Sequence, residues 1–178
     1  TRADCLPDDV IEYLSELNTQ TNLTVELGLQ TIHNSTLEYI NRGYEHKKFC
    51  EGFSKLKKRK IRTCLHIING LPFETDKMML ETAKEVARLS PEAVKIQMLH
   101  IIKGTRLEKI YNEGLELLSA DEYIDIVVKQ LEYLPPETVI ERITGGGDKS
   151  KLIAPMWSAN KIAVLGGIDK RQAQLDSI

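Results

Sequence analysis

The chain has 178 residues, of which 28% are charged and 42% hydrophobic, and its formal net charge is −2 at pH 7. This length is enough for one domain with a sizeable core. No apolar run approaches the roughly 20 residues that span a bilayer, so no membrane partner is expected. The near-neutral charge argues against general binding to nucleic acid or anionic membranes, although it leaves a local basic patch open.

The chain contains three cysteines, Cys5, Cys50 and Cys64, which are far apart and form neither a CxxC nor a CxxxCxxC motif. The sequence therefore encodes no local structural zinc site or iron–sulfur cluster, and we assign no metal ligand. Few, scattered thiols are typical of a reducing, cytoplasmic setting, and free cysteines are often simply buried. The first residues, TRADCLPDD, include no initiator Met and no signal peptide, which predicts a fragment of a longer protein.

The first expected helix begins near Pro7. Four apolar residues follow at helical spacing, namely Val10, Tyr13, Leu14 and Leu17. Residues 24–30 then alternate with period two, which predicts a strand with Glu26, Gly28 and Gln30 on its polar face. Because helical patterns flank this strand, we expect its apolar face to pack on helices and its polar face to line the interior of a βα barrel.

Two helices are expected after this strand. A short one over 35–41 leads to Arg42 and Gly43, which places a guanidinium near the carboxyl end of the strand. A longer one runs from about Glu45 to the basic run at 57–60. That run is open to a nucleic-acid interpretation, but a solvated helix end, where cations complement the helix dipole, is favoured.

The remaining pattern continues the alternation of strands and helices. Further strands are expected over 61–68, 93–102 and 138–144, and further helices over 75–89, 106–113, 119–134 and in the tail from Ser158. Four βα-like units make about half of an eight-stranded barrel, with parallel strands and outer helices in a single domain. The open edges of such a sheet again favour a fragment.

Catalytic residues of such folds gather at the carboxyl ends of the strands. On the later strands, alternation predicts inward-facing side chains at Cys64, His66, Ile68, Lys95, Gln97, Leu99, Arg142 and Thr144. His66 alone would be read as a core histidine, but polar groups at matched heights on neighbouring strands favour a shared site. Lys95 has two interpretations, a Schiff-base nucleophile or an internal salt bridge with Glu26 or another carboxylate, and the salt bridge is favoured.

The glycine-rich segment over 145–150 is not a Walker A motif. Glycines let backbone N–H groups converge on an anion, so a phosphate cradle is one interpretation of this segment. A flexible loop that faces substrate is the other, and both stay open.

Several segments together resemble a known family. ELGLQTIHNSTLEYINRGY, HIINGLPFET and MLHIIKGTRLE, in this order and spacing, resemble the later strands of the radical S-adenosylmethionine (SAM) superfamily. The resemblance is to its YhcC-type branch, which is related to the Elongator catalytic subunit and to coproporphyrinogen dehydrogenase. TRADCLPDD resembles the third-strand segment of that branch, and GGGDKSKLIAPMWSANK resembles its C-terminal loop.

The resemblance implies an α/β fold, the C-terminal portion of a partial (βα)6 TIM-like barrel. Residues 1–134, approximately, would belong to the radical SAM core, and residues 135–178 to a C-terminal extension. In that superfamily a [4Fe–4S] cluster reductively cleaves SAM to a 5′-deoxyadenosyl radical. The CxxxCxxC loop that holds the cluster lies before the second strand, so this chain would lack it and would be inactive alone. The parent would be a cytoplasmic oxidoreductase that needs an electron donor and acts on an unknown substrate, a small molecule or RNA.

The resemblance also implies a SAM-binding wall. Its expected residues are Thr1, Glu26, Gln30, Arg42, His66, Ile68 and Ile101. Gln30 and Arg42 match residues that bind SAM, with Arg42 pairing with its carboxylate, and Glu26 lies on the same face. A guanidinium suits that role because it makes a two-pronged, charge-assisted contact to a carboxylate.

Four of these residues carry more specific expectations. His66 matches a position that contacts the ribose, and Ile68 and Ile101 match positions that pack on adenine. Thr1 lies where some relatives place another contact to the ribose or the amino group. Phe73 replaces a usual Gly in the turn after the second strand, which predicts a narrower mouth.

Two other functions remain as alternatives. The first is an ordinary βα-barrel lyase or aldolase that uses Lys95. The second is a non-catalytic binding module without the cluster. A CxxxCxxC motif upstream of Thr1 in the parent protein would separate the radical enzyme from the binding module, and no catalytic residue is assigned.

Overall fold

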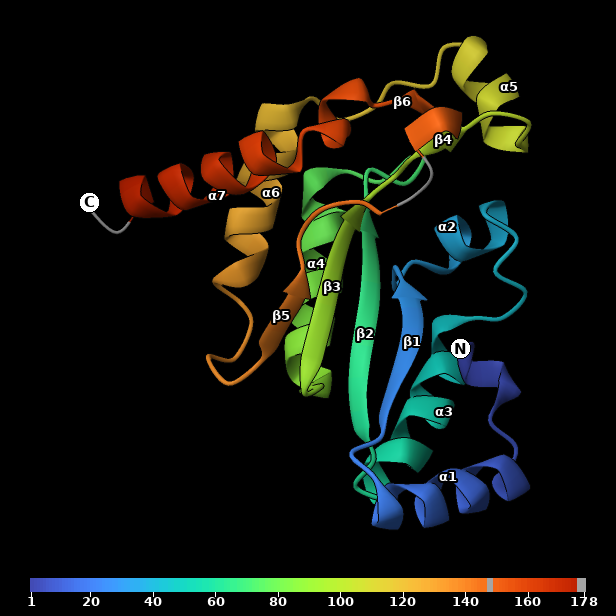
Figure 1. The fold of residues 1–178 in the computed structure, drawn as a ribbon. Coiled ribbons are helices and arrows are strands. Elements are labelled where there is room, and N and C mark those ends of the chain that lie inside the picture. The colour runs from blue at the N-terminus through green and yellow to red at the C-terminus, as the bar shows by residue number, and fades with distance from the viewer. Residues whose placement is uncertain (147–148, 176–178) are drawn as a thin grey trace.

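The centre of the computed structural model, which describes residues 1–146 and 149–175, is a four-stranded parallel sheet in the order β1-β2-β3-β5 (Figure 1). Its strands are β1 (Thr24–Gln30), β2 (Arg62–Asn69), β3 (Ala93–Met98) and β5 (Val139–Arg142). A second, antiparallel pair joins β4 (Ile101–Ile102) to β6 (Leu152–Ala154).

Helices precede, connect and follow the strands. They are α1 (Asp8–Gln20), α2 (Asn34–Tyr39), α3 (His46–Lys58), α4 (Asp76–Leu89), α5 (Arg106–Asn112), α6 (Ala120–Leu131) and α7 (Lys161–Leu175). Short 3-10 turns cover Ala3–Cys5, Lys149–Lys151 and Met156–Ala159. In Figure 1, α3 and α4 lie behind the sheet, and its other face is turned toward the viewer without a covering helix. Within the described part of the chain, no helix has the length and apolar character needed to cross a membrane.

The main core lies between the sheet and the helices. The alternation in β1 is confirmed, because Val25, Leu27 and Leu29 are buried in this core while Glu26 on the other face is exposed. The helices contribute apolar residues at helical spacing, among them Phe49, Phe53, Leu56, Val86, Val127, Val164 and Ile168. This one-sided burial is what the period-two pattern predicts for a strand covered by helices on one face.

The prediction of one continuous strand over 93–102 is wrong in its second half. β3 ends at Met98, and Ile101 and Ile102 pair instead with β6. The chain turns away from the sheet at Leu99, whose N–H donates to the carbonyl of Asn69 (2.9 Å). Ile101 pairs with Ala154, which is far along the chain. The early end of β3 therefore depends on a long-range contact that a local sequence pattern cannot show.

The helix expected over 119–134 also ends early. Its start is confirmed, because Ser119 and Glu122 form a reciprocal capping box. The last helical residue is Leu131, and the short stretch before Pro135 continues as a turn. The residue before a proline disfavours helical geometry, so the helix ends before Leu134 rather than at it.

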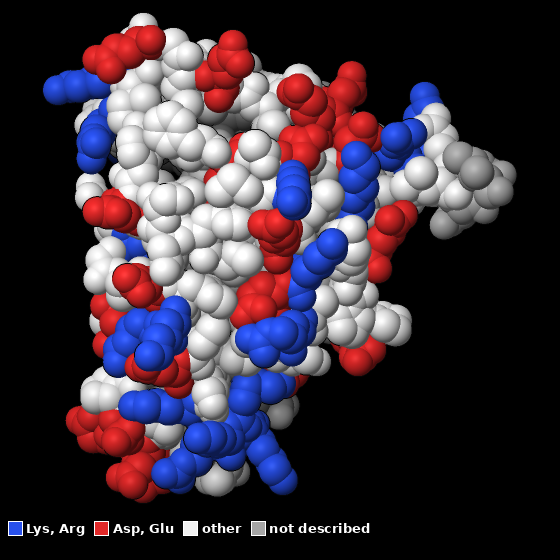
Figure 2. Space-filling model, turned by 180° about the vertical axis from the view of Figure 1, so that it is seen from behind, with Lys and Arg blue, Asp and Glu red and all other residues white. Residues whose placement is uncertain are grey.

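The basic run at the end of α3 is partly neutralised by acidic partners. Within the run, Lys57 lies 2.6 Å from Glu92, and just before it Lys55 lies 2.6 Å from Asp8. Figure 2 shows Lys and Arg gathered at the bottom of the molecule, with acidic side chains beside them. This arrangement agrees with the solvated helix end favoured from the sequence.

Candidate functional site

The face of the sheet that no helix covers carries a row of charged and polar side chains, one from each strand. These residues, hereafter the inner-face row, are Glu26, His66, Lys95 and Glu141. Lys95 Nζ lies 2.6 Å from Glu26 Oε1 and 3.4 Å from Glu141 Oε2. His66 Nε2 lies 2.8 Å from the other oxygen of Glu26. The salt bridge favoured for Lys95 from the sequence is therefore present.

Register brings these residues together. His66 is opposite Gly28 on one side and opposite Lys95 on the other, so alternation directs the polar residues of three strands to the same face. On β5 the sequence predicted Arg142, but Glu141 makes the contact. A register irregularity between Val94 and Lys95 sets two β5 residues against one on β3, and such a bulge reverses the parity expected from alternation.

The protonation states of the row follow from its contacts. The hydrogen bond from Lys95 holds the pKa of Glu26 below its ordinary value, and the same bond raises the pKa of Lys95. Burial lowers the pKa of His66, although the neighbouring Glu26 acts in the opposite direction. At neutral pH the row thus contains a charged lysine, an ionised Glu26 and a neutral imidazole. A charged, ion-paired lysine is not a free amine, which disfavours the lyase or aldolase alternative.

The cysteines do not form a cluster-binding set. Cys64 is buried on β2, where burial and the nearby Glu141 raise the pKa of its thiol to about 12. Cys5 is exposed in the N-terminal turn, and Cys50 lies on α3. Without a CxxxCxxC motif, these residues do not fit the ligand set of a [4Fe–4S] cluster.

The carboxyl end of β1 contains two polar atoms without partners. Gln30 Oε1 and Arg42 Nε are buried, and neither has a hydrogen-bond partner among the described residues. The Nη2 atom of Arg42 donates to the carbonyl of Gly28 and to the hydroxyl of Tyr44, and the guanidinium lies over the Tyr44 ring (4.7 Å to the centroid). Buried polar groups are nearly always hydrogen-bonded, so this acceptor and this donor are groups that a bound ligand or water would satisfy.

Gly28 makes this arrangement possible. A Cβ atom built on Gly28 would lie 2.5 Å from Gln30 Nε2 and 3.3 Å from Arg42 Nη2. Gln30 itself has φ +70°, at the point where the pairing of β1 with β2 becomes irregular. The glutamine side chain therefore lies over the glycine, on the face that the strand alternation predicts for both residues.

Thr1 lies beside this end of the strand. Its backbone nitrogen donates to the carbonyl of Glu26 (2.5 Å), and its carbonyl accepts from the N–H of Gly28 (3.4 Å). Thr1 thus lies along β1, where its backbone contacts Glu26 and Gly28.

The two expected apolar residues are not equivalent. Ile101 has no exposed surface and packs with Leu71, Leu99 and Ala154 in a small cluster of its own. Ile68 is half-buried and packs against the outside of that cluster. Of the two, only Ile68 offers side-chain surface for a ligand.

Two features near the site were not apparent from the sequence. Glu74 accepts a hydrogen bond from the buried Thr31, which ties the turn after β2 to the end of β1. Gly145 packs against His100, because a Cβ there would lie 2.3 Å from the imidazole Cε1. At least the first glycine of the run thus has a packing role. Gly147 and Asp148, on which the anion-cradle interpretation also depends, lie outside the described residues.

Comparison with known proteins places the chain in a family. The family described as "Radical SAM superfamily" matches residues 1–86, and the family described as "Radical_SAM C-terminal domain" matches residues 91–174. The predicted division into a core over about 1–134 and an extension over about 135–178 stays a prediction.

The curated relatives include two bacterial proteins. YtqA of Bacillus subtilis is 54% identical over 171 residues, which are 96% of this chain and 53% of YtqA. YhcC of Escherichia coli K12 is 32% identical over 172 residues, which are 96% of this chain and 56% of YhcC. The chain thus spans about half the length of these relatives.

A solved structure supports the fold. The archaeal Methanocaldococcus infernus Elp3, with an N-terminal deletion, superposes with a TM-score of 0.80 over 96% of this chain and 41% of that protein, at 22% identity. The α/β fold predicted from the sequence is confirmed by this likeness. The matches to both families and the YhcC-type relatives show that the chain belongs to the radical SAM superfamily, in its YhcC-type branch.

Proposed function

We propose that this chain forms one wall of the SAM-binding site of a cytoplasmic radical SAM enzyme. The observation that carries the proposal is the pair of unpartnered buried atoms, Gln30 Oε1 and Arg42 Nε, at the carboxyl end of β1. SAM carries an ammonium group and a carboxylate on its amino-acid portion, and these groups match an open acceptor and an open donor.

The other contacts of the wall follow from the inner face. His66 and Glu26 would hold the ribose hydroxyls, since a neutral imidazole and a carboxylate both accept hydrogen bonds. The half-buried Ile68 would contact the adenine, and Ile101 would support it from behind. Thr1 would contribute backbone or side-chain contacts at the edge of β1. Each of these groups binds and orients the cofactor, and none of them takes a proton from it.

The cluster has to be held by another part of the parent protein. Bound SAM, reduced by a [4Fe–4S] cluster, supplies a strongly oxidising radical in this superfamily. The cysteines of this chain do not fit such a cluster, so we derive no step that runs through it. The substrate of the parent would be a small molecule or RNA. An unbiased search for the modified product, after anaerobic reconstitution with an electron donor, would identify it.

The role of Arg42 has a direct test in the reconstituted whole protein. Arg42→Ala is expected to weaken SAM binding by about 1.5–3 kcal/mol, the scale of a hydrogen bond to a charged group. Calorimetric titration with SAM measures the effect. Arg171→Ala is the matched control, because Arg171 pairs with Asp125 on α6 and is not part of the wall. Unchanged SAM affinity in Arg42→Ala would remove Arg42 from the site.

The enzymatic activity has a separate test. The parent sequence upstream of Thr1 is expected to contain a CxxxCxxC motif, and the reduced protein is expected to release 5′-deoxyadenosine from SAM. A parent without that motif would support the binding module instead.

A further inference from the structure

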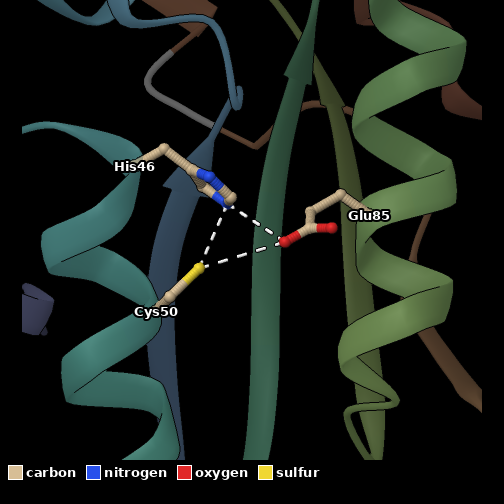
Figure 3. A group of neighbouring side chains, drawn as sticks. All are labelled: His46, Cys50 and Glu85. Atoms are coloured by element: carbon tan, nitrogen blue, oxygen red, sulfur yellow. Dashed lines mark hydrogen bonds and ion pairs between the residues drawn. The ribbon is translucent and has the colours of Figure 1, made fainter.

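The opposite side of the sheet contains a second group of side chains that the proposed function does not use. His46 and Cys50 on α3 face Glu85 on α4 (Figure 3). His46 Nε2 lies 3.3 Å from Glu85 Oε1 and 3.4 Å from Cys50 Sγ, and Cys50 Sγ lies 3.9 Å from Glu85 Oε1. The three groups are partly buried, so they are sheltered but reachable from solvent.

Rigid elements hold these three residues in place. His46 and Cys50 are four residues apart on a helix, a spacing that directs both side chains to the same face. The buried Phe49 and Phe53 fix α3 against the sheet, and the buried Ala83 and Val86 fix α4. Ligands on packed helices keep their geometry better than ligands on loops.

The distances suit a metal ion. Zinc binds sulfur at about 2.3 Å and nitrogen or oxygen at about 2.0–2.2 Å, so tetrahedral ligand atoms lie roughly 3.4–3.6 Å apart. The three observed separations of 3.3, 3.4 and 3.9 Å are close to this range. One ion placed among the three atoms would reach all of them with little movement.

The protonation states are also compatible with a metal. Burial lowers the pKa of His46, so its imidazole is neutral at pH 7 and has a lone pair to donate. Burial and Glu85 raise the pKa of Cys50, so its thiol keeps its proton until a metal displaces it. Binding would release that one proton to solvent and form a metal–thiolate bond.

We propose that His46, Cys50 and Glu85 bind one zinc ion, with water as the fourth ligand. A thiolate with an imidazole and a carboxylate favours zinc over the hard cations magnesium and calcium, which take oxygen ligands. The thiolate and the carboxylate together neutralise the two positive charges of the ion. The zinc site joins α3 to α4 on the outer side of the sheet, so it is a structural clamp that is separate from the proposed SAM wall.

Arg88 has to adjust when zinc binds. It now donates to both oxygens of Glu85, from Nη2 to Oε1 and from Nε to Oε2, each at 2.7 Å. Zinc would replace the bond to Oε1, while the bond to Oε2 can remain. Arg88 is 65% exposed, so this movement meets little resistance. A retained hydrogen bond to a ligating carboxylate is a common way to orient it.

The test uses the whole protein, with any upstream cluster cysteines loaded with iron and sulfide. Zinc is titrated in competition with a chromophoric chelator, and bound zinc is counted by elemental analysis. We expect about one zinc per chain, and at least tenfold weaker binding in Cys50→Ser and in His46→Gln. Cys5→Ser is the matched control, since Cys5 is an exposed cysteine outside the group, and it should bind as the unmodified protein does.

X-ray absorption at the zinc edge of the unmodified protein gives an answer that depends on no variant. The expected signal is a single sulfur at about 2.3 Å with nitrogen and oxygen ligands around it. That measurement also decides the matter if Cys50→Ser does not fold. Zinc without a sulfur ligand, zinc affinity that Cys50→Ser leaves unchanged, or no bound zinc would each overturn the proposal.

Discussion

Phe73 has a backbone conformation that is unfavourable for a residue with a side chain. It has φ +67°, in the left-handed region, and its side chain is 78% exposed. The resemblance places a glycine here in related proteins, and glycine adopts this conformation without strain. The phenylalanine ring lies edge-on to Tyr39, with centroids 5.0 Å apart, and this contact offsets part of the backbone cost.

A pair of variants isolates the backbone cost at this position. Phe73→Gly and Phe73→Ala both lose the contact with Tyr39, but only glycine relieves the left-handed strain of about 1–2 kcal/mol. Glycine also gives the unfolded chain more entropy, worth about 0.5–1 kcal/mol. We therefore expect Phe73→Gly to be more stable than Phe73→Ala by about 0.5–1 kcal/mol in urea unfolding. Equal stability of the two variants would contradict a strained backbone at Phe73.

At the scale of elements, a buried pair of amides joins β2 to α6. Asn69 Nδ2 donates to Gln130 Oε1 (2.9 Å), and Gln130 Nε2 donates to Asn69 Oδ1 (2.8 Å) and to the carbonyl of Met79 (3.1 Å). Both side chains are almost fully buried. The pair fixes the end of β2, from which the chain enters the turn at the mouth of the site.

The coupling between these amides is measurable with a double-mutant cycle. Asn69→Ala and Gln130→Ala should each lower the free energy of unfolding by about 1–3 kcal/mol, because each leaves a buried amide unpaired. The double variant should lose less than the sum, with a coupling of about 0.5–3 kcal/mol, since the second change removes a group that is already unpaired. Thermal or urea unfolding gives all four values. Additive losses would show that the amides do not stabilise each other.

Elements with a strong local signal were predictable from the sequence. The alternation of β1 and the capping box of α6 depend on neighbouring residues, and both are present. The end of β3 at Met98 depends on the pairing of Ile101 with Ala154, which only the folded chain brings together. Local patterns thus identify an element better than they identify where it ends.

The same limit applies to the candidate site. The salt bridge between Lys95 and Glu26 was predictable, because a lysine on an apolar strand needs a partner. The contact of Lys95 with Glu141 was not predictable, because a register irregularity between β3 and β5 changes which β5 residue faces inward. Alternation predicted the face on which Gln30 lies, but not that its Oε1 would be buried without a partner, because burial and hydrogen bonding depend on contacts that only the folded chain forms.

At the scale of the whole molecule, the two faces of the sheet differ in what stabilises them. The helix-covered face is apolar and buried, while the inner face is held by charges that connect all four strands. Lys95 is central to the inner face, because it is buried and contacts carboxylates from both edge strands, Glu26 and Glu141.

Replacing this lysine should therefore weaken the sheet in a pH-dependent manner. Lys95→Met leaves two carboxylates without their cation, and we expect it to lower the free energy of unfolding by about 1–3 kcal/mol at neutral pH. Glu26 is 45% exposed, so solvent screening places the loss toward the lower end and makes it smaller in high salt.

The sign of the pH effect follows from Glu26. Its pKa is lower in the folded chain than in the unfolded one, chiefly through the hydrogen bond from Lys95. This shift stabilises the fold above the unfolded pKa of Glu26, and the contribution disappears as the pH falls through the folded pKa. In urea unfolding, the difference between the unmodified chain and Lys95→Met should thus be largest above the unfolded pKa of Glu26 and shrink as the pH falls through its lower folded pKa. Lys77→Met, at a lysine that is 85% exposed, is the control and should change stability little at any pH. A Lys95→Met loss that stays constant with pH would mean that packing of the lysine chain, and not its charge, stabilises the inner face.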